Sequence, residues 1–380
     1  MPDVIVVGAG PVGMLLAGDL ARRGVDVEVL ERRPAAGNGS RAIGVHAPAL
    51  AALEASGTTE RLLADAVRVG RGEARSGERV LGVVRFDRLS TRFPFVATLP
   101  QAATERVLAA GAPEPLRGAT VRAVLPRADA VRVRAGIGGR PIELTGALVV
   151  VASGAAGRDL VYRPAAVRPR EYPDRYLMTD AALPPRPDAE VAVVNLDRHG
   201  VLESFPLPGG VRRFVAWDDP GADPEPEARA ARLRAALVAR GEAEASDAIT
   251  EASAFRVRRV LARRLRNGRV FVIGDAAHEV SPIGGQGMNL GLLDAAGLAP
   301  LLATWIRTGD APEAELQRWE RRRLASARTA ARLAAVNTSL GRPLPGALDA
   351  ARRATVRAML GPATERLFAR AYAMGLDRDA

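Results

Sequence analysis

Three glycines near the N-terminus have the spacing of a turn that binds phosphate. Gly8, Gly10 and Gly13 follow the apolar run 4–7 and lead into the amphipathic segment PVGMLLAGDLARRG. In a strand–turn–helix unit, the first glycine allows the tight turn, the second lets a pyrophosphate approach the backbone, and the third lets helix and strand pack closely. Glu31 ends the next apolar segment, where its carboxylate can accept hydrogen bonds from ribose hydroxyls. These residues predict a dinucleotide site but do not distinguish a nicotinamide from a flavin dinucleotide.

A second glycine-rich segment, VFVIGDAAHEVSPIGGQGMNLGLLDA, spans residues 270–295. Asp275 follows a buried apolar run, where its carboxylate can accept a hydrogen bond from a polyol hydroxyl of a ribityl chain. The loop 284–287 leads into a helix that begins near Met288 and Asn289. The amides and positive dipole end of that helix would stabilise negative charge on a reduced flavin.

This second segment resembles the flavin-ribose segment of the class A flavin monooxygenases, the 4-hydroxybenzoate hydroxylase family. The resemblance implies non-covalent FAD, and it is strong over residues 3–125 and 268–300. It implies no catalytic side chain, because the flavin carries the chemistry, and it places Pro282 and Gly285 near the flavin ring. The expected cofactor-binding residues are Gly8, Gly10, Pro11, Val12, Gly13, Glu31, Arg32, Arg41, Gln101, Val121, Asp275, Pro282, Gly285, Gly287, Met288 and Asn289.

Several of these positions come from the resemblance alone. Arg41, in SRAIGVHAPALAALEASG, matches an arginine that contacts the FAD phosphates. In LPQAATERVL, Gln101 is expected near the ribityl or phosphate groups and Arg106 beside the cofactor. Val121 matches the position whose backbone meets the adenine. His278 belongs to the GDAAH string, and we expect it to be a packing or hydrogen-bonding residue rather than an acid or base.

One position departs from the family pattern. Where the family has Asp-Gly followed by a serine and an arginine, this chain has VVVASGAAGRDLVYR, so that Ser153 stands at the aspartate position and Gly154 is kept. The family aspartate helps to hold both the flavin and the nicotinamide donor. A serine offers one hydrogen bond but no charge. Direct reduction by NADPH is therefore in question, although a tolerated substitution is the simpler interpretation.

The resemblance implies an FAD-dependent monooxygenase that uses NADPH or NADH and O₂. A flavin C4a-hydroperoxide would transfer oxygen to an aromatic or polyketide-like small molecule by hydroxylation, epoxidation or Baeyer–Villiger insertion. Two alternatives remain open: an FAD-dependent dehydrogenase or reductase without oxygen transfer, and a flavin-binding protein that needs an external flavin reductase. The GWxWxIP segment and lysine of flavin halogenases are absent, and the residues after the flavin segment are too few for the thioredoxin-like domain of larger phenol hydroxylases.

The elements expected around these residues define an α/β fold. We expect a Rossmann-type FAD-binding domain with an interleaved antiparallel-sheet substrate domain and C-terminal helices. The FAD-binding domain would comprise residues 1–75, 101–160 and 268–310, the substrate domain 76–100 and 161–267, and the helical segment 311–380. Within the substrate domain, the segments 79–89 and 93–100 alternate between apolar and polar residues, as antiparallel strands do. The aromatic residues expected beside the substrate are Phe205, Trp217 and Tyr172.

Composition and charge exclude several kinds of cofactor and partner. Cysteine is absent, which excludes disulfides, thiolate metal sites and a cysteine-linked flavin, and three histidines make a histidine-rich metal site improbable. The net charge of +11 comes from arginines that are spread along the chain and paired with acids, so we expect no nucleic acid partner. An anionic carrier protein is a weaker expectation. No apolar run reaches the ~18 residues of a membrane span, and the first strand begins within a few residues of Met1, so we expect a cytoplasmic protein without a signal peptide.

Overall fold

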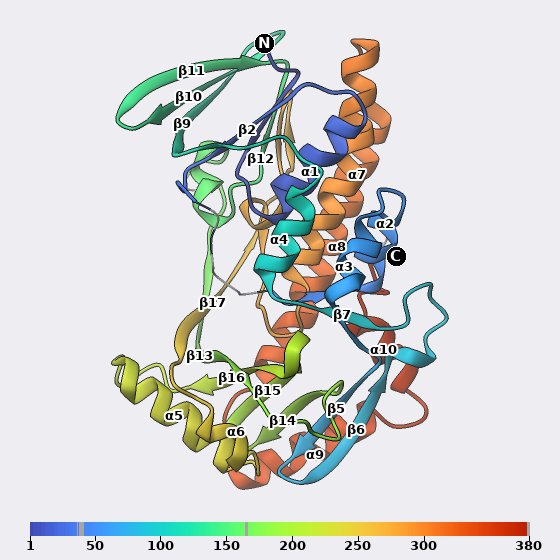
Figure 1. The fold of residues 1–380 in the computed structure, drawn as a ribbon. Helices are drawn as coiled ribbons and strands as arrows, with labels where there is room; N and C mark the ends of the chain where they lie inside the picture. The colour runs from blue at the N-terminus through green and yellow to red at the C-terminus, as the bar shows by residue number, and fades with distance from the viewer. Residues whose placement is uncertain (36, 38–41, 164–165, 378–380) are drawn as a thin grey trace.

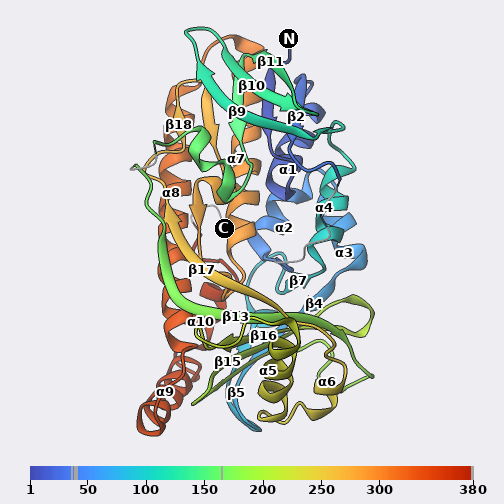
Figure 2. The ribbon, with the colours of Figure 1, turned by 90° about the vertical axis from the view of Figure 1, so that its left-hand side faces the viewer.

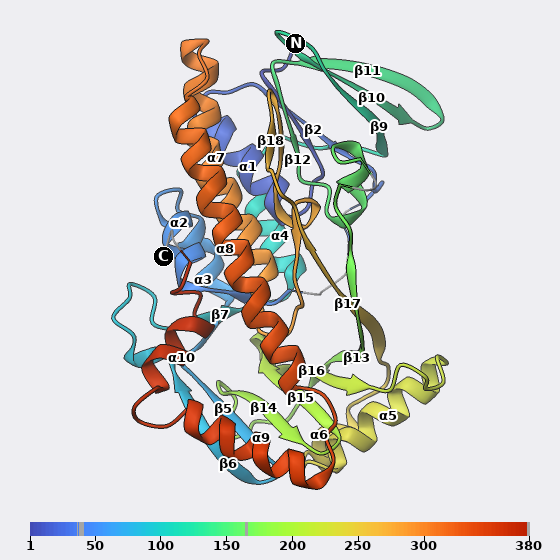
Figure 3. The same cartoon turned by 180° about the vertical axis from the view of Figure 1, so that it is seen from behind.

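The computed structural model describes residues 1–35, 37, 42–163 and 166–377. Two regions, each built around a sheet, lie one above the other and are joined by the long strands β13 and β17 (Figure 1). The helix α8 (Glu313–Leu340) extends from the first region to the second (Figure 3).

The first region is built on a six-stranded sheet in the order β18-β19-β12-β1-β2-β8. Every neighbouring pair is parallel except β18 with β19. The strands β1 and β12 are buried along their whole length, which explains their continuous apolar runs, VIVV and LVVV. The strand bounds are β1 (Val4–Val7), β2 (Val27–Glu31), β8 (Leu116–Arg117), β12 (Leu148–Val151), β18 (Arg266–Asn267) and β19 (Val270–Val272).

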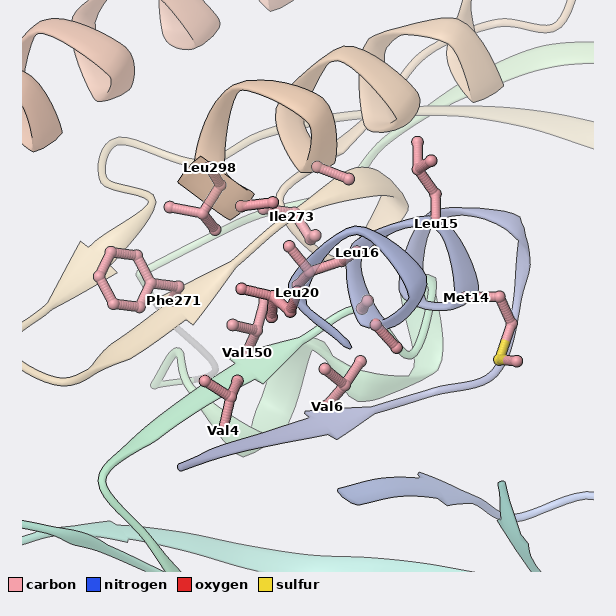
Figure 4. Close-up of a cluster of buried hydrophobic side chains, with 14 of the residues drawn as sticks. Val4, Val6, Met14, Leu15, Leu16, Leu20, Val150, Phe271, Ile273 and Leu298 are labelled. Carbon is pink, nitrogen blue, oxygen red and sulfur yellow. The ribbon is translucent and has the colours of Figure 1, made fainter. Parts of the chain in front are cut away.

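Helices cover one face of this sheet. They are α1 (Pro11–Arg22), which contacts both α4 (Gln101–Ala109) and α7 (Gly287–Thr308), and α8, which packs on α7. Leu16 and Leu20 of α1 meet Phe271 and Leu298 over the sheet (Figure 4), and all four side chains are buried. Burial of each such side chain contributes roughly 1.5–3 kcal/mol. Within the described ranges α7 is the one helix long and apolar enough to cross a membrane, but 67% of its apolar window is buried in this core.

The opposite side of the six-stranded sheet carries a three-stranded meander (Figure 1). Its strands are β9 (Ala119–Pro126), β10 (Val131–Ile137) and β11 (Arg140–Gly146), all antiparallel. Two 3-10 turns, Ala155–Leu160 and Gly274–Ala276, follow β12 and β19 at the carboxyl ends of the strands. This edge of a parallel sheet is where open α/β folds bind ligands.

The second region is an eight-stranded sheet in the order β20-β17-β13-β16-β15-β14-β5-β6. Only β14 and β5 pair in parallel. Its strands are β5 (Arg71–Ser76), β6 (Arg79–Arg85), β13 (Arg170–Ala182), β14 (Ala192–Asp197), β15 (Gly200–Pro206), β16 (Val211–Asp218), β17 (Ser253–Leu261) and β20 (His278–Glu279). The helices around it are α5 (Pro226–Val238), α6 (Ala243–Asp247), α9 (Gly346–Met359) and α10 (Glu365–Tyr372).

A second three-stranded sheet, β3-β7-β4, lies between the two regions beside α2 and α3 (Figure 2). Its elements are β3 (Gly44–Val45), β4 (Val67–Val69), β7 (Val96–Thr98), α2 (Ala47–Glu54) and α3 (Thr58–Asp65). The segments 79–89 and 93–100 are therefore not partners in one sheet, because β6 pairs with β5 and β7 with β3 and β4. The large sheet also begins at Arg71, inside the segment that we assigned to the FAD-binding domain.

Candidate functional site

The N-terminal glycines form the turn that their spacing predicts. Gly8 has a φ of +110°, and a Cβ there would lie 2.7 Å from the carbonyl oxygen of Ala152, so only glycine fits. A Cβ on Gly13 would lie 1.9 Å from the carbonyl oxygen of Gly8, which shows how closely α1 approaches the turn. In contrast, none of the described residues has an atom within 4 Å of a Cβ built on Gly10, which lines an open cleft. The space above Gly10 is thus left for a ligand.

The N-terminus of α1 opens onto the same cleft. Pro11 and Val12, its first residues, line the cleft, and no side chain caps the helix. The free amides and the positive dipole end suit a pyrophosphate. These features and the empty space above Gly10 fit the phosphates of FAD.

Glu31 lies at the end of β2 and is 5% exposed. Its Oε2 accepts a hydrogen bond from the amide of Ala9 (2.7 Å), and its Oε1 accepts from the amide (2.9 Å) and guanidinium (3.0 Å) of Arg33. Burial raises the pKa of Glu31, but these hydrogen bonds outweigh it and lower the pKa overall. The carboxylate is therefore charged and fixed beside the glycine turn, and Oε2 keeps a lone pair for a ribose hydroxyl. Arg32 is exposed and also lines the cleft.

The second glycine segment lies across the cleft from the first. Asp275 is exposed on the 3-10 turn after β19 and lines the cleft with Pro282, Gly285, Gly287 and Met288. The amide of Gly285 donates to the carbonyl of Pro282 (2.8 Å), and α7 begins directly after this turn. The predicted flavin loop and helix start therefore face the dinucleotide turn.

Asn289 was predicted to bind the cofactor but lies behind the wall of the cleft. It is fully buried, its Oδ1 accepts from the amide of His46 (2.8 Å), and its Nδ2 donates to the carbonyls of Gly44 (2.9 Å) and Gly285 (3.1 Å). Asn289 is absent from the lining of the cleft. It joins the flavin loop to the segment before α2 and so positions both.

The remaining predicted cofactor residues divide into three groups. Gln101 and Val121 line the cleft, and the Oε1 of Gln101 accepts from the amide of Ala42 (3.1 Å). Arg106 is exposed and does not line it. Arg41 lies outside the described residues.

His46 is a site residue that the sequence argument missed. Its side chain lines the cleft beside Gly285, and its Nδ1 has no hydrogen-bond partner among the described residues. Burial lowers the pKa of His46 to about 4, although a hydrogen bond with the backbone of Gly285 works in the opposite direction. The imidazole is therefore neutral next to the predicted flavin loop. A histidine directly before an apolar helix was the available signal.

Ser153 lines the cleft at the carboxyl end of β12. Its Oγ is buried and has no hydrogen-bond partner within the described chain. The neighbouring Gly154 has a φ of +67°, which a glycine adopts freely. The serine is thus at the place predicted for the family aspartate, facing the same cleft as Gly8 and Asp275.

The cleft continues from the dinucleotide turn to the face of the large sheet and encloses about 1610 Å³. Phe205 of β15 lines it, with Met178, Val194 and Val215 of neighbouring strands. Trp217 and Tyr172, the other two aromatics expected beside the substrate, do not line it.

The physical reason for the position of Trp217 is that the end of α8 covers its part of the sheet. Gly341, which follows α8, accepts a hydrogen bond from the amide of Val201 (2.8 Å). Trp217 packs against Gly200, and its Nε1 donates to Asp174 (3.2 Å), which Arg342 holds in an ion pair of 2.7 Å. Trp217 is therefore part of a contact between sheet and helix.

Two charged residues of the large sheet also line the cleft and were missed. Arg213 of β16 is ion-paired with Asp180 (2.6 Å), whereas Glu203 of β15 has no hydrogen bond or ion pair with any described residue. Glu203 lies two positions from Phe205, so strand alternation puts both on one face, and this was the signal that could have found it. Within the same described ranges, no group of three or more His, Cys, Asp or Glu residues could hold a metal ion.

Comparison with known proteins gives the family of this chain. The family model described as "FAD binding domain" matches residues 1–334. The chain is 34% identical over 363 residues to the 6-methylpretetramide 4-monooxygenase of Streptomyces rimosus, covering 89% of this chain but only 63% of that enzyme's length.

Two solved structures are similar. One is the anhydrotetracycline hydroxylase OxyS from Streptomyces rimosus, with a TM-score of 0.78, 29% identity, and coverage of 98% of this chain and 75% of that one. The other is the p-nitrophenol 4-monooxygenase PnpA from Pseudomonas putida, with a TM-score of 0.87, coverage of 100% and 99%, and 23% identity, which speaks for the fold alone. The chain belongs to the FAD-binding family of class A flavin monooxygenases, of the 4-hydroxybenzoate hydroxylase type.

Proposed function

We propose that the protein is an FAD-dependent monooxygenase that uses NAD(P)H and O₂ on an aromatic or polyketide-like metabolite. The observation that carries this proposal is the single cleft that connects the dinucleotide turn at Gly10 with the apolar face of the large sheet at Phe205. A cofactor held at one end and a substrate held at the other would share one enclosed space. The relatives named above support the substrate class.

Different residues of the cleft would bind different parts of the cofactor. The amides at the start of α1 and the carboxylate of Glu31 would hold the phosphates and a ribose, and Asp275 would hold the ribityl chain. The N-terminus of α7 would face the flavin ring and stabilise negative charge there. When bound, FAD supplies the redox chemistry and the transfer of one oxygen atom. The apolar sheet wall keeps water away from the reacting atoms.

The proposal is tested with purified protein. We expect bound FAD, and NADPH or NADH oxidation under air that anhydrotetracycline or p-nitrophenol stimulates, with one labelled oxygen atom from O₂ in the product. A product without the label would overturn the proposal in favour of a dehydrogenase. If neither NADPH nor NADH reduces the flavin directly, and an added flavin reductase restores activity, the reductant would be that partner rather than NAD(P)H.

A further inference from the structure

Glu203 is a buried carboxyl group set among apolar side chains on the substrate face of the cleft. In the sheet it lies between Val194 of β14 and Val215 of β16. The C-terminal helix α9 adds Val356 and Met359 to the same lining. Glu203 is only 6% exposed and lines the cleft, so its carboxyl group is largely removed from bulk water.

No described charge stabilises Glu203. The cation nearest in the sheet register, Arg213, is already bound through both its Nε and one terminal nitrogen to Asp180. The groups that face Glu203 from other elements are the hydroxyls of Tyr176 on β13 and Tyr372 on α10, and burial raises the pKa of both.

Those hydroxyls do not satisfy the carboxyl group. The hydroxyl of Tyr372 donates to the Oδ1 of Asn337 on α8 (3.0 Å), and the hydroxyl of Tyr176 has no partner among the described residues. Burial alone raises the pKa of Glu203 to about 8. Glu203 therefore carries its proton at neutral pH and holds one O–H donor and one carbonyl acceptor that the described protein leaves unused.

We propose that the neutral carboxyl of Glu203 anchors the substrate by donating a hydrogen bond to an uncharged carbonyl or hydroxyl oxygen, and that it excludes molecules that present a carboxylate there. This inference deepens the proposed function and rests on it. A buried polar group left unpaired is costly, so a ligand oxygen at this place is selected over a purely apolar group. A ligand carboxylate at this place would be desolvated beside Glu203, with no described cation to compensate its charge. The substrate class is thus a neutral oxygenated ring system.

Three probes with one ring system separate the alternatives: 2-acetylnaphthalene is neutral, 2-naphthoate is an anion, and 2-naphthylmethylamine is a cation. Each is titrated into the oxidised holoenzyme, and binding is followed by the change in flavin absorbance. We expect 2-acetylnaphthalene to bind at least about tenfold more tightly than 2-naphthoate. Its affinity should fall as the pH rises above about 8, because Glu203 then loses its donor proton.

Variants make the test specific to Glu203. Glu203→Gln keeps an uncharged donor, so its affinity for 2-acetylnaphthalene at neutral pH should stay within about threefold of that of the unmodified enzyme. The affinity of this variant should no longer fall at high pH. Glu203→Leu should weaken binding by about tenfold. The matched control is Glu190→Gln, the same change at an exposed position, which should bind as the unmodified enzyme does.

Two outcomes would overturn the inference. One is tightest binding of 2-naphthylmethylamine with its loss in Glu203→Gln, which would make Glu203 an ionised partner of an amine. The other is an unchanged pH profile in Glu203→Gln, a comparison that stands even when Glu203→Leu fails to fold. Because no NAD(P)H or oxygen transfer enters these titrations, the labelled-oxygen experiment fails or succeeds independently.

Discussion

The hydroxyl of Ser153 occupies the space that a side chain at residue 157 would need. A Cβ built on Gly157 would lie 1.6 Å from the Oγ of Ser153 and 2.8 Å from its Cβ. Ser153 lies between β12 and the 3-10 turn 155–160, and Gly157 lies within that turn. Ser153 and Gly157 are therefore matched in volume, and a side chain at residue 157 would require Ser153 to move.

Gly157→Ala should destabilise the protein by about 1–3 kcal/mol, because the added methyl group forces Ser153 out of its place. Urea unfolding of the holoenzyme measures the change. Gly346→Ala is the matched control, since no atom lies within 4 Å of a Cβ there and the residue begins α9. Equal stability of the Gly157→Ala variant and the unmodified protein would contradict the volume match. Combination with Ser153→Gly should recover part of the loss.

Ser153→Asp should speed reduction of the flavin by NADPH by roughly tenfold, about 1.4 kcal/mol of barrier. The reason is that a carboxylate at this lining position would restore the family's means of holding the nicotinamide donor. Anaerobic stopped-flow measurement of flavin bleaching gives the rate. Ser153→Asn separates charge from size, and it should remain slow. A rate for Ser153→Asp equal to that of the unmodified enzyme would show that the serine does not limit reduction.

Local sequence predicted the backbone of the glycine turn, and the binding of the cofactor by that turn stays a prediction. The turn at Gly8, Gly10 and Gly13 depends on backbone constraints within one strand–turn–helix unit, so residue type and spacing carry the information. Asp275 and the loop before α7 were predicted for the same reason. Asn289 shows the limit: it lies in the first turn of α7 as expected, but its side chain bonds residues 44 and 46, which lie more than two hundred positions away.

The substrate half depends on contacts between distant segments. Alternation along β16 predicts the face on which Trp217 lies, but not that the end of α8 at Gly341 covers that part of the sheet. The residues adjacent to Glu203 in sequence do not show that it lines the same cleft as Val356 and Met359 of α9. Similarly, β7 follows β6 in sequence but pairs with β3 and β4. These features follow from packing that sequence periodicity does not encode.

Gly10→Val should give a folded protein that has lost FAD. The backbone at Gly10 is extended (φ −79°, ψ 179°) and no protein atom would meet the new side chain, so the fold tolerates it. The valine would fill the space left for the pyrophosphate, and a clash of about 1–3 kcal/mol weakens binding by roughly 5- to 150-fold. The ratio of flavin to protein absorbance reports the loss, and circular dichroism reports the fold. If the variant retains a full complement of FAD, the phosphates do not bind next to Gly10.

Phe205→Ala should weaken binding of 2-acetylnaphthalene by about tenfold, because the aromatic wall of the cleft is removed. Trp217→Phe should leave the affinity within about twofold and lower stability by about 1 kcal/mol, since only the hydrogen bond to Asp174 is lost. Flavin absorbance titration and urea unfolding separate the two effects. A large loss of affinity in Trp217→Phe would place the substrate nearer α8 than the cleft lining indicates.

His278 should make the stability of the protein depend on pH. Its Nε2 lies 2.6 Å from Asp294, which also accepts from Arg323 (2.8 Å), and the three side chains are at most 1% exposed. Burial lowers the pKa of His278, but the adjacent Asp294 carboxylate outweighs this and raises it overall. The imidazolium therefore stabilises the fold fully below the unfolded pKa of about 6.5, and this stability is lost as the pH rises through the raised value.

The difference in unfolding free energy between the unmodified protein and His278→Asn should thus be largest near about pH 6, at about 1–3 kcal/mol, and should shrink toward about pH 9. Urea unfolding at a constant FAD concentration measures it. His199→Asn is the control, because His199 is exposed and its imidazole bonds only the guanidinium of Arg198 among the described residues. A difference that stays flat or grows with pH would mean that His278 is neutral in the fold. Asp294 would then be balanced by Arg323 alone.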